Sequence, residues 1–171
     1  AYHNRGIAYY LQGQLDKAMV DYNKAIELNP QLAPAYHNRG KVYYLQGQLD
    51  KAITDFTRAI ELDPQLAPAY NNRGLAYYQQ DKLDKAIADF TKAIDLDPTD
   101  AVTYYNRGKA YRNKVELNKA MFDYNMAIEL DHQIYLAQMD LAVAIYNNLG
   151  IVYYQQDKLD KAITDFTKAI E

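Results

Sequence analysis

The sequence predicts an all-α solenoid, a stack of antiparallel helix–turn–helix repeats, and three observations lead to this fold class. A short phrase that ends in glycine recurs every 34 residues, apolar residues between the phrases follow helical spacing, and proline closes most of the intervals. A fixed period of about 20 to 50 residues indicates stacked supersecondary repeats in place of one central core. The glycines are Gly6, Gly40, Gly74 and Gly108, with a fifth, Gly150, eight residues beyond the place that the period gives.

The second repeat shows how each interval is expected to fold. Residues 33–47 predict a first helix, which Gly47 ends as a C-cap or turn. Residues 48–63 carry an apolar stripe of period 3.6 and predict a second helix. Pro64 stops that helix, because proline lacks an amide hydrogen and disfavours helix in the residue before it. Gly40 and Ala52 are expected where the two helices approach closely.

The residue types that recur in the same order are an aromatic, Gly, Tyr, Ala, an aromatic and Ala, followed in the first three repeats by Pro. In the second repeat these are Tyr36, Gly40, Tyr43, Ala52, Phe56, Ala59 and Pro64. The pattern resembles the tetratricopeptide repeat, here a bacterial-type array with "NRG" in its repeats. The resemblance implies one right-handed superhelical array over 1–171, with repeats near 1–32, 33–66, 67–100, 101–134 and 143–171 and an insertion near 135–142.

Two departures from this family's pattern recur together. Arg39 and Arg73 precede their glycines, where the family usually has leucine, and Asp55 and Asp89 stand in the second helices. Because the guanidinium fork matches a carboxylate, each Arg is expected to pair with an Asp across the helix interface, in a structural role. The alternative is an Arg that lies along the surface with its head group in water. The other members of the two rows are Arg5, Arg107, Asp21, Asp123 and Asp165, and the fifth repeat has Leu149 in place of Arg.

The insertion between the fourth and fifth repeats lacks the closing proline. Either the first helix of the fifth repeat starts about two turns early, after a break near 131–133, or the two helices on either side are fused. A fused helix would free the fifth repeat to pack on another molecule, as in a domain swap. We favour the lengthened helix. The apolar residues of this segment then cover a neighbouring repeat or form an intermolecular contact: Ile134, Leu136, Met139, Leu141 and Val143.

The resemblance implies a concave groove lined by the first helices, and one row of that groove consists of asparagines. An amide carries donors and an acceptor, so it can pair with a peptide backbone whatever the peptide's side chains are. A similar ladder holds extended peptide in the arrays attached to protein O-GlcNAc transferases. The alternative is that these asparagines tie neighbouring helices together. The candidate peptide-binding residues are Asn4, Asn38, Asn72, Asn106 and Asn148, with His37, Lys41, Tyr44, Tyr78, Lys109 and Arg112.

Composition argues against several other functions. A net charge of −3 provides no basic footprint for nucleic acid or an anionic membrane, and the absence of cysteine excludes thiol chemistry and disulfides. No convergent catalytic groups are recognisable, so we expect no enzyme, no metal and no cofactor. His3 and His37 are repeat-equivalent but lack the further ligands of a zinc site. The basic residues and asparagines of a chaperone-type carboxylate clamp are not in place.

The sequence therefore predicts a non-catalytic protein–protein interaction scaffold that binds a peptide or protein segment in its groove. One alternative is a self-associating module, through its uncapped ends or the segment 131–150, because the last helix would expose Ile163, Phe166 and Ile170. Another is the regulatory array of a larger enzyme. The chain starts and stops inside repeats and lacks an initial Met, so we interpret it as a piece of a longer protein. Its compartment stays open, with the cytoplasm favoured only by default.

Overall fold

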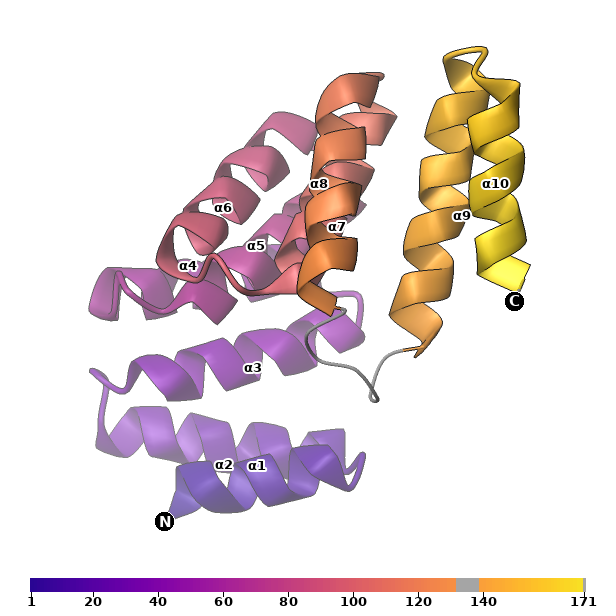
Figure 1. Ribbon diagram of the computed structural model, residues 1–171. Coiled ribbons are helices and arrows are strands. Elements are labelled where there is room, and N and C mark those ends of the chain that lie inside the picture. The colour runs from indigo at the N-terminus through magenta and orange to yellow at the C-terminus, as the bar shows by residue number, and fades with distance from the viewer. Residues whose placement is uncertain (132–138, 171) are drawn as a thin grey trace. The chain divides into compact units, whose positions relative to one another are not determined.

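The computed structural model describes residues 1–131 and 139–170, with side chains described for 1–130 and 145–170. Over these ranges it consists of ten α-helices and no strands, which confirms the predicted all-α repeat fold (Figure 1). None of the helices in these ranges combines the length and apolar character needed to cross a membrane. The helices are α1 (Tyr2–Leu11), α2 (Leu15–Leu28), α3 (Ala33–Leu45), α4 (Leu49–Leu62), α5 (Ala67–Gln79), α6 (Leu83–Leu96), α7 (Ala101–Asn113), α8 (Leu117–Asp131), α9 (Met139–Gln155) and α10 (Leu159–Ile170).

The helices form two compact units, an N-terminal unit (1–96) with α1 to α6 and a C-terminal unit (97–171) with α7 to α10. Within each unit, consecutive helices pair, as α3 with α4 or α9 with α10, and each pair stacks on the next through contacts such as α4 on α5 and α8 on α9. Each pair contains the first and second helix of one repeat. The sequence predicts that both units belong to one array. Because this depends on how the two units are joined, it stays a prediction.

Each helical pair closes on a glycine that faces an aromatic ring. A Cβ atom added at Gly40 would lie 2.7 Å from the ring of Phe56, and one at Gly74 would lie 2.7 Å from Phe90. Both rings are fully buried, and so is Ala52 beside them. Two helices therefore approach as closely as the sequence predicts, and only a hydrogen fits between backbone and ring. The same contact joins Gly6 to Tyr22, Gly108 to Tyr124 and Gly150 to Phe166.

The second helix of a repeat ends where a proline follows. Asp63 ends α4 in an extended conformation (φ −138°, ψ 91°), as the residue before Pro64 must. Its side-chain Oδ1 accepts a hydrogen bond from the backbone amide of Gln65 at 3.0 Å, which fixes the turn. Asn29, before Pro30, ends α2 in the same way and accepts from Gln31. The chain is thus redirected into the first helix of the next repeat.

The fourth repeat lacks that proline, and its second helix, α8, ends at Asp131. The next helix, α9, begins at Met139, about one turn before position 143, which is equivalent to the start of α5 at Ala67. Within the described residues this helix extends about one turn before the equivalent position, and the predicted two-turn extension stays a prediction. The expected break near 131–133, the fused alternative and the surroundings of Ile134, Leu136, Met139, Leu141 and Val143 all lie outside the described residues or side chains.

The hairpin turn inside each repeat uses one residue with positive φ. At the end of α3, Gly47 has φ +71°; its amide donates to the carbonyl of Tyr44, and the next amide, of Gln48, donates to Tyr43. This is the Schellman arrangement, which favours glycine. The fourth repeat forms the same turn with Val115 at φ +61°, and this side chain is 74% exposed. A β-branched residue is strained in this region of backbone space.

We therefore expect Val115→Gly to raise the free energy of unfolding by about 1 kcal/mol. Glycine avoids the cost of about 1–2 kcal/mol that the left-handed conformation imposes on an L-residue. Part of this gain is offset, because glycine also increases the entropy of the unfolded chain. Urea denaturation followed by circular dichroism measures the change. Asp81→Gly is the matched control, because Asp81 occupies the equivalent turn at φ +58° and aspartate tolerates it better. Equal effects of the two substitutions would contradict strain at Val115.

Candidate functional site

In the N-terminal unit the first helices α1, α3 and α5 lie next to one another, with α3 in contact with both others. Residues at helical spacing on these three helices form one surface, which we call the first-helix face. It carries aromatic, amide and imidazole groups together with one lysine. Its members are His3, Tyr10, His37, Asn38, Lys41, Tyr44, Asn72 and Leu75.

Histidine–asparagine pairs tie the three helices together across this face. Nδ2 of Asn38 lies 3.0 Å from Nε2 of His3, and Nδ2 of Asn72 lies 2.8 Å from Nε2 of His37. The His37 ring also bonds to the backbone of Pro68, which can only accept. The other ring nitrogen therefore carries the hydrogen, and Nε2 accepts from Asn72. These two contacts show that the asparagines of this row tie neighbouring first helices together.

An apolar depression of about 180 Å³ opens on the same face. Lys41 lies at it with its Nζ 4.6 Å from the ring centroid of Tyr10, a cation–π contact. The hydroxyl of Tyr44 accepts a 2.6 Å hydrogen bond from Gln79. The volume resembles that of an engineered cavity of about 150 Å³ that admits benzene. The lining residues are Tyr10, Lys41, Tyr44, Leu45, Phe56, Asn72 and Leu75.

The C-terminal unit has its own polar cluster on α7 and α9. Arg112 donates from Nη1 to Oδ1 of Asn148, and Nδ2 of Asn148 donates to the hydroxyl of Tyr105 at 3.2 Å. The ammonium of Lys109 lies 5.4 Å from the ring centroid of Tyr105. Burial, followed by the positive charge of Arg112, lowers the pKa of Lys109. Two cations are thus held three residues apart on one helix face, and Asn106 is buried nearby on the same helix.

The structure brings only part of the predicted peptide-binding set together. Lys41, Tyr44 and Asn72 meet at the depression, and Lys109, Arg112 and Asn148 meet in the C-terminal unit. Asn4 is exposed on α1, where its Oδ1 lies 3.3 Å from His3, and Tyr78 lies on α5 outside the lining of the depression. The predicted ladder of five asparagines would have to cross both units, and it stays a prediction. Gln79 is not in the predicted peptide-binding set, although its spacing of 35 residues from Tyr44 matches that of the histidine–asparagine pairs.

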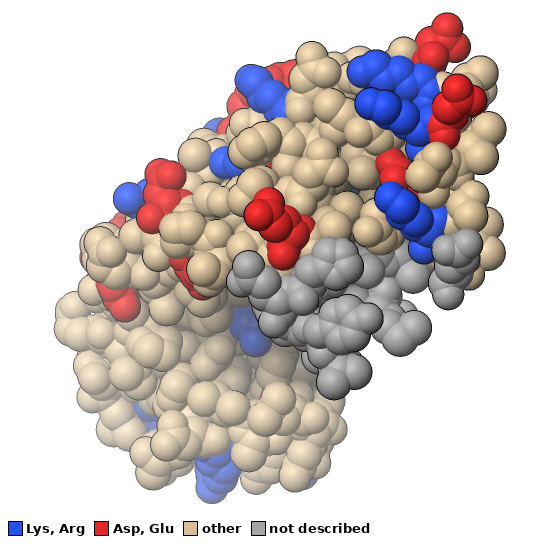
Figure 2. Space-filling model, in the orientation of Figure 1, with Lys and Arg blue, Asp and Glu red and all other residues tan. Residues whose placement is uncertain are grey.

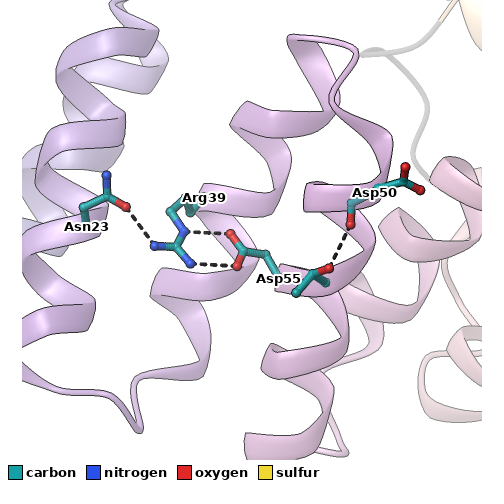
Figure 3. Close-up of polar contacts among 5 residues, drawn as sticks. Asn23, Arg39, Asp50 and Asp55 are labelled. Carbon is teal, nitrogen blue, oxygen red and sulfur yellow. Dashed lines mark hydrogen bonds and ion pairs between the residues drawn. The ribbon is translucent and has the colours of Figure 1, made fainter.

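The arginine row lies away from this face, at the junction of the two helices of each repeat. Arg39 donates from Nε and Nη2 to the two carboxylate oxygens of Asp55, at 2.7 and 2.8 Å. Its Nη1 donates to Asn23 of the preceding repeat at 2.8 Å, so one guanidinium joins three helices (Figure 3). Arg73 repeats the arrangement with Asp89 and Thr57. Forked pairs also join Arg5 to Asp21 and Arg107 to Asp123.

Tyrosines flank each of these arginines, three residues before and four after. The guanidinium carbon of Arg39 lies 5.6 Å from the ring centroid of Tyr36 and 5.9 Å from that of Tyr43. Both tyrosines are only partly buried, so neither belongs to the fully buried core. They cover the ion pair and stack on the cation instead. A tyrosine at those two positions in every repeat was the sequence signal for this contact.

The fifth repeat departs from the row. Leu149 is buried where the other repeats have Arg, while Asp165 stays buried with Lys168 at 3.7 Å as its ion-pair partner. Burial raises the pKa of Asp165, whereas the hydrogen bonds from Arg5 lower that of Asp21. Burial also raises the pKa of Asp123, which opposes the effect of Arg107. The guanidinium thus outweighs burial at Asp21 but not at Asp123, and the fifth repeat has no arginine at this position.

Within the described residues, no group of three or more His, Cys, Asp or Glu side chains is placed to hold a metal ion. The first-helix face offers hydrogen-bonding groups, ring surface and one lysine. Such an arrangement has the chemistry to bind a chain segment.

Comparison with protein families gives repeated matches. A model described as "TPR repeat" matches residues 6–47 and 40–81, and a model described as "Tetratricopeptide repeat" matches 67–100, 101–134 and 143–171. A search of the curated proteins finds no match.

Solved structures resemble the chain over nearly its whole length. "Crystal structure of MamA" has 27% identity and a TM-score of 0.84, covering 96% of this chain and 92% of that one. MamA from Desulfovibrio magneticus RS-1 has 20% identity and a TM-score of 0.86, covering 99% and 91%. YrrB, described as a TPR protein with an unusual peptide-binding site, has 22% identity and a TM-score of 0.79, covering 99% and 83%. At these lower identities the likeness is one of fold.

For the arginine row, we expect Arg73→Leu to lower the free energy of unfolding by about 3–5 kcal/mol, because it leaves the buried Asp89 without its counter-charge. Chemical denaturation measures the loss. Leu149→Arg is the reciprocal change, since it supplies the missing partner of Asp165, and it should stabilise the protein. A loss below about 1 kcal/mol for Arg73→Leu would contradict a structural role for the pair.

Acid should weaken the protein through His37. Burial, with the nearby charge of Lys41, lowers the pKa of His37 from 6.5 to about 4. Between these values the unfolded chain takes up a proton that the folded protein does not, so this stability is complete above pH 6.5 and is lost as the pH falls to 4. The loss amounts to about 3 kcal/mol. His37→Asn, which copies Asn71 of the third repeat, should flatten the pH dependence of urea unfolding, and parallel profiles would contradict the assignment.

Proposed function

Because the chain belongs to the tetratricopeptide repeat family, whose members are protein–protein interaction scaffolds, we propose that it is a non-catalytic scaffold that binds an extended peptide or protein segment on its first-helix face. The observation that carries the proposal is the depression in the N-terminal unit, where Lys41, Tyr44 and Asn72 converge around an apolar floor. Ligand sites of this kind combine mainly apolar walls with a small number of placed polar groups. The same fold supports a peptide-binding site in YrrB.

The polar contacts suggest how a segment is held. Nδ2 of Asn72 is engaged by His37, which leaves its carbonyl oxygen to accept a backbone N–H of the ligand. Such a bond is independent of the ligand's side chains and fixes only its direction and register. The depression beside it accepts one apolar side chain, which provides the selectivity. The helix-tying contacts hold Asn72 and Tyr44 in place before the ligand arrives, so less conformational entropy is lost on binding.

A second candidate function is self-association, which a different observation favours. On α10, Ile163 is 64% exposed and Ile170 is 86% exposed, whereas the equivalent Ile53 and Ile60 of α4 are half-buried in the stack with α5. Phe166, which we also expected to be exposed, is half-buried against Gly150. The apolar end of α10 could therefore receive another chain. Measuring the mass of the protein over a range of concentrations, before peptide is added, separates this function from peptide binding.

Selection of a random peptide library displayed on phage against the immobilised protein tests the primary proposal. We expect enriched peptides whose affinity, measured by fluorescence anisotropy, falls about three- to tenfold with Asn72→Ala, the loss of about one hydrogen bond. Gln31→Ala in the exposed loop after α2 is the control and should leave the affinity unchanged. If no peptide is enriched, or if every selected peptide binds the Asn72→Ala variant as well as the wild type, the first-helix face is not the binding site.

A further inference from the structure

Charge is distributed unevenly between the two helices of each repeat. The chain has 22 Asp and Glu residues and a net charge of −3, yet none of these acids lies in α1, α3, α5 or α7. They lie instead in the second helices, in the loops and at Asp140 of α9. In the N-terminal unit, the surface over α1 and much of α3 in Figure 2 is largely uncharged, and the charged side chains visible there are basic. The charge of the face proposed to bind a ligand is thus opposite in sign to the net charge of the chain.

Most of the positive charge on the first helices is already neutralised. Arg5, Arg39, Arg73 and Arg107 each form a forked ion pair with an aspartate of the second helix. The first helices α1, α3, α5 and α7 carry three further cations. One is a lysine at the depression of the N-terminal unit, and the other two lie on α7 in the C-terminal unit. They are Lys41, Lys109 and Arg112. In the N-terminal unit, Lys41 is therefore the first-helix cation that lies at the depression.

We propose that the segment bound on the first-helix face is acidic, with a carboxylate next to an apolar side chain in its sequence. This inference rests on the proposed function and specifies the ligand of that same site. The apolar side chain enters the depression between Tyr10, Tyr44 and Leu75, and the neighbouring carboxylate reaches the Lys41 ammonium. Lys41 lies on the ring of Tyr10, so its charge is presented at the wall of the depression and not extended into water.

The C-terminal unit offers a second, basic subsite that would bind an acidic residue. Lys109 and Arg112 are like charges on one face of α7, and Lys109 is half-buried. An anion between two like charges removes their repulsion, and a guanidinium presents a planar fork that fits a carboxylate. Asn148 holds one nitrogen of Arg112 and orients the group. An acidic segment that binds this unit therefore places a carboxylate beside Arg112.

The chemistry of both sites favours an acidic peptide over a nucleic acid. A nucleic acid would have to approach a protein whose net charge is −3 and whose second helices are rich in carboxylates, and three cations provide little counterion release. An acidic peptide satisfies the cations and the apolar floor together.

The library selection described above also tests this inference through the composition of the enriched peptides. We expect Asp or Glu within two residues of an aliphatic or aromatic residue, and affinity that falls as salt is raised from 50 to 500 mM on the order of tenfold. Enriched peptides that are neutral or basic, and bind without salt dependence, would overturn the inference while leaving peptide binding intact. The failure to enrich any peptide removes the proposed function itself, so the two failures are distinguishable.

Charge reversal at one lysine locates the contact. For a selected acidic peptide, Lys41→Glu should weaken binding about tenfold or more, since it removes a charge-assisted hydrogen bond and adds repulsion. Lys92→Glu, on the exposed side of α6, changes the net charge equally and should alter the affinity less than twofold. Lys41→Gln keeps the side chain's bulk and should give an intermediate loss. Equal effects of Lys41→Glu and Lys92→Glu would show that only net charge matters and would overturn the assignment.

Discussion

The close approach of two helices at a glycine is the constraint on which the rest of this protein depends. In every repeat a ring of the second helix lies where a Cβ atom would otherwise stand, as Phe56 does over Gly40. At that distance an arginine next to the glycine reaches the aspartate sixteen residues later with both prongs of its guanidinium, as Arg39 reaches Asp55. A bulkier residue in place of the glycine would separate the helices and break the ion pair together with the packing.

The ion pair extends this local constraint to the stacking of repeats. The third nitrogen of Arg39 donates to Asn23, and that of Arg73 to Thr57, each on the second helix of the preceding repeat. One half-buried cation thus links three helices, and two tyrosine rings flank it. Buried pairs of this kind add specificity of geometry as much as net stability, because desolvation offsets much of their attraction. The charge pattern follows from the same arrangement. Acids on second helices neutralise the arginines of first helices, and the first helices α1, α3, α5 and α7 keep a few further cations and carry no acid.

Stacking in register also constructs the candidate site, because it places residues about 35 positions apart side by side. His37 meets Asn72, and Tyr44 meets Gln79, by this rule. These contacts use up some of the hydrogen-bonding groups that a free amide or hydroxyl would offer and orient the rest. The residues of the candidate site are therefore held in place by the bonds that stabilise the stack, and these bonds orient their remaining polar groups.

The sequence by itself determined the helical repeats, their turns and the close contact at each glycine, because these follow from local spacing, from proline and from residue size. It also predicted that Arg39 and Arg73 pair with aspartates, and the structure has those ion pairs. Only the tertiary structure decided which atoms of Asn72 are engaged, that Lys41 and Tyr44 border one depression while Tyr78 does not, and that Tyr43 flanks a cation instead of entering the core. These outcomes depend on which groups of the neighbouring repeat come within hydrogen-bonding or ring-contact distance. A single repeat does not contain those groups, and they come together only when the helices are stacked.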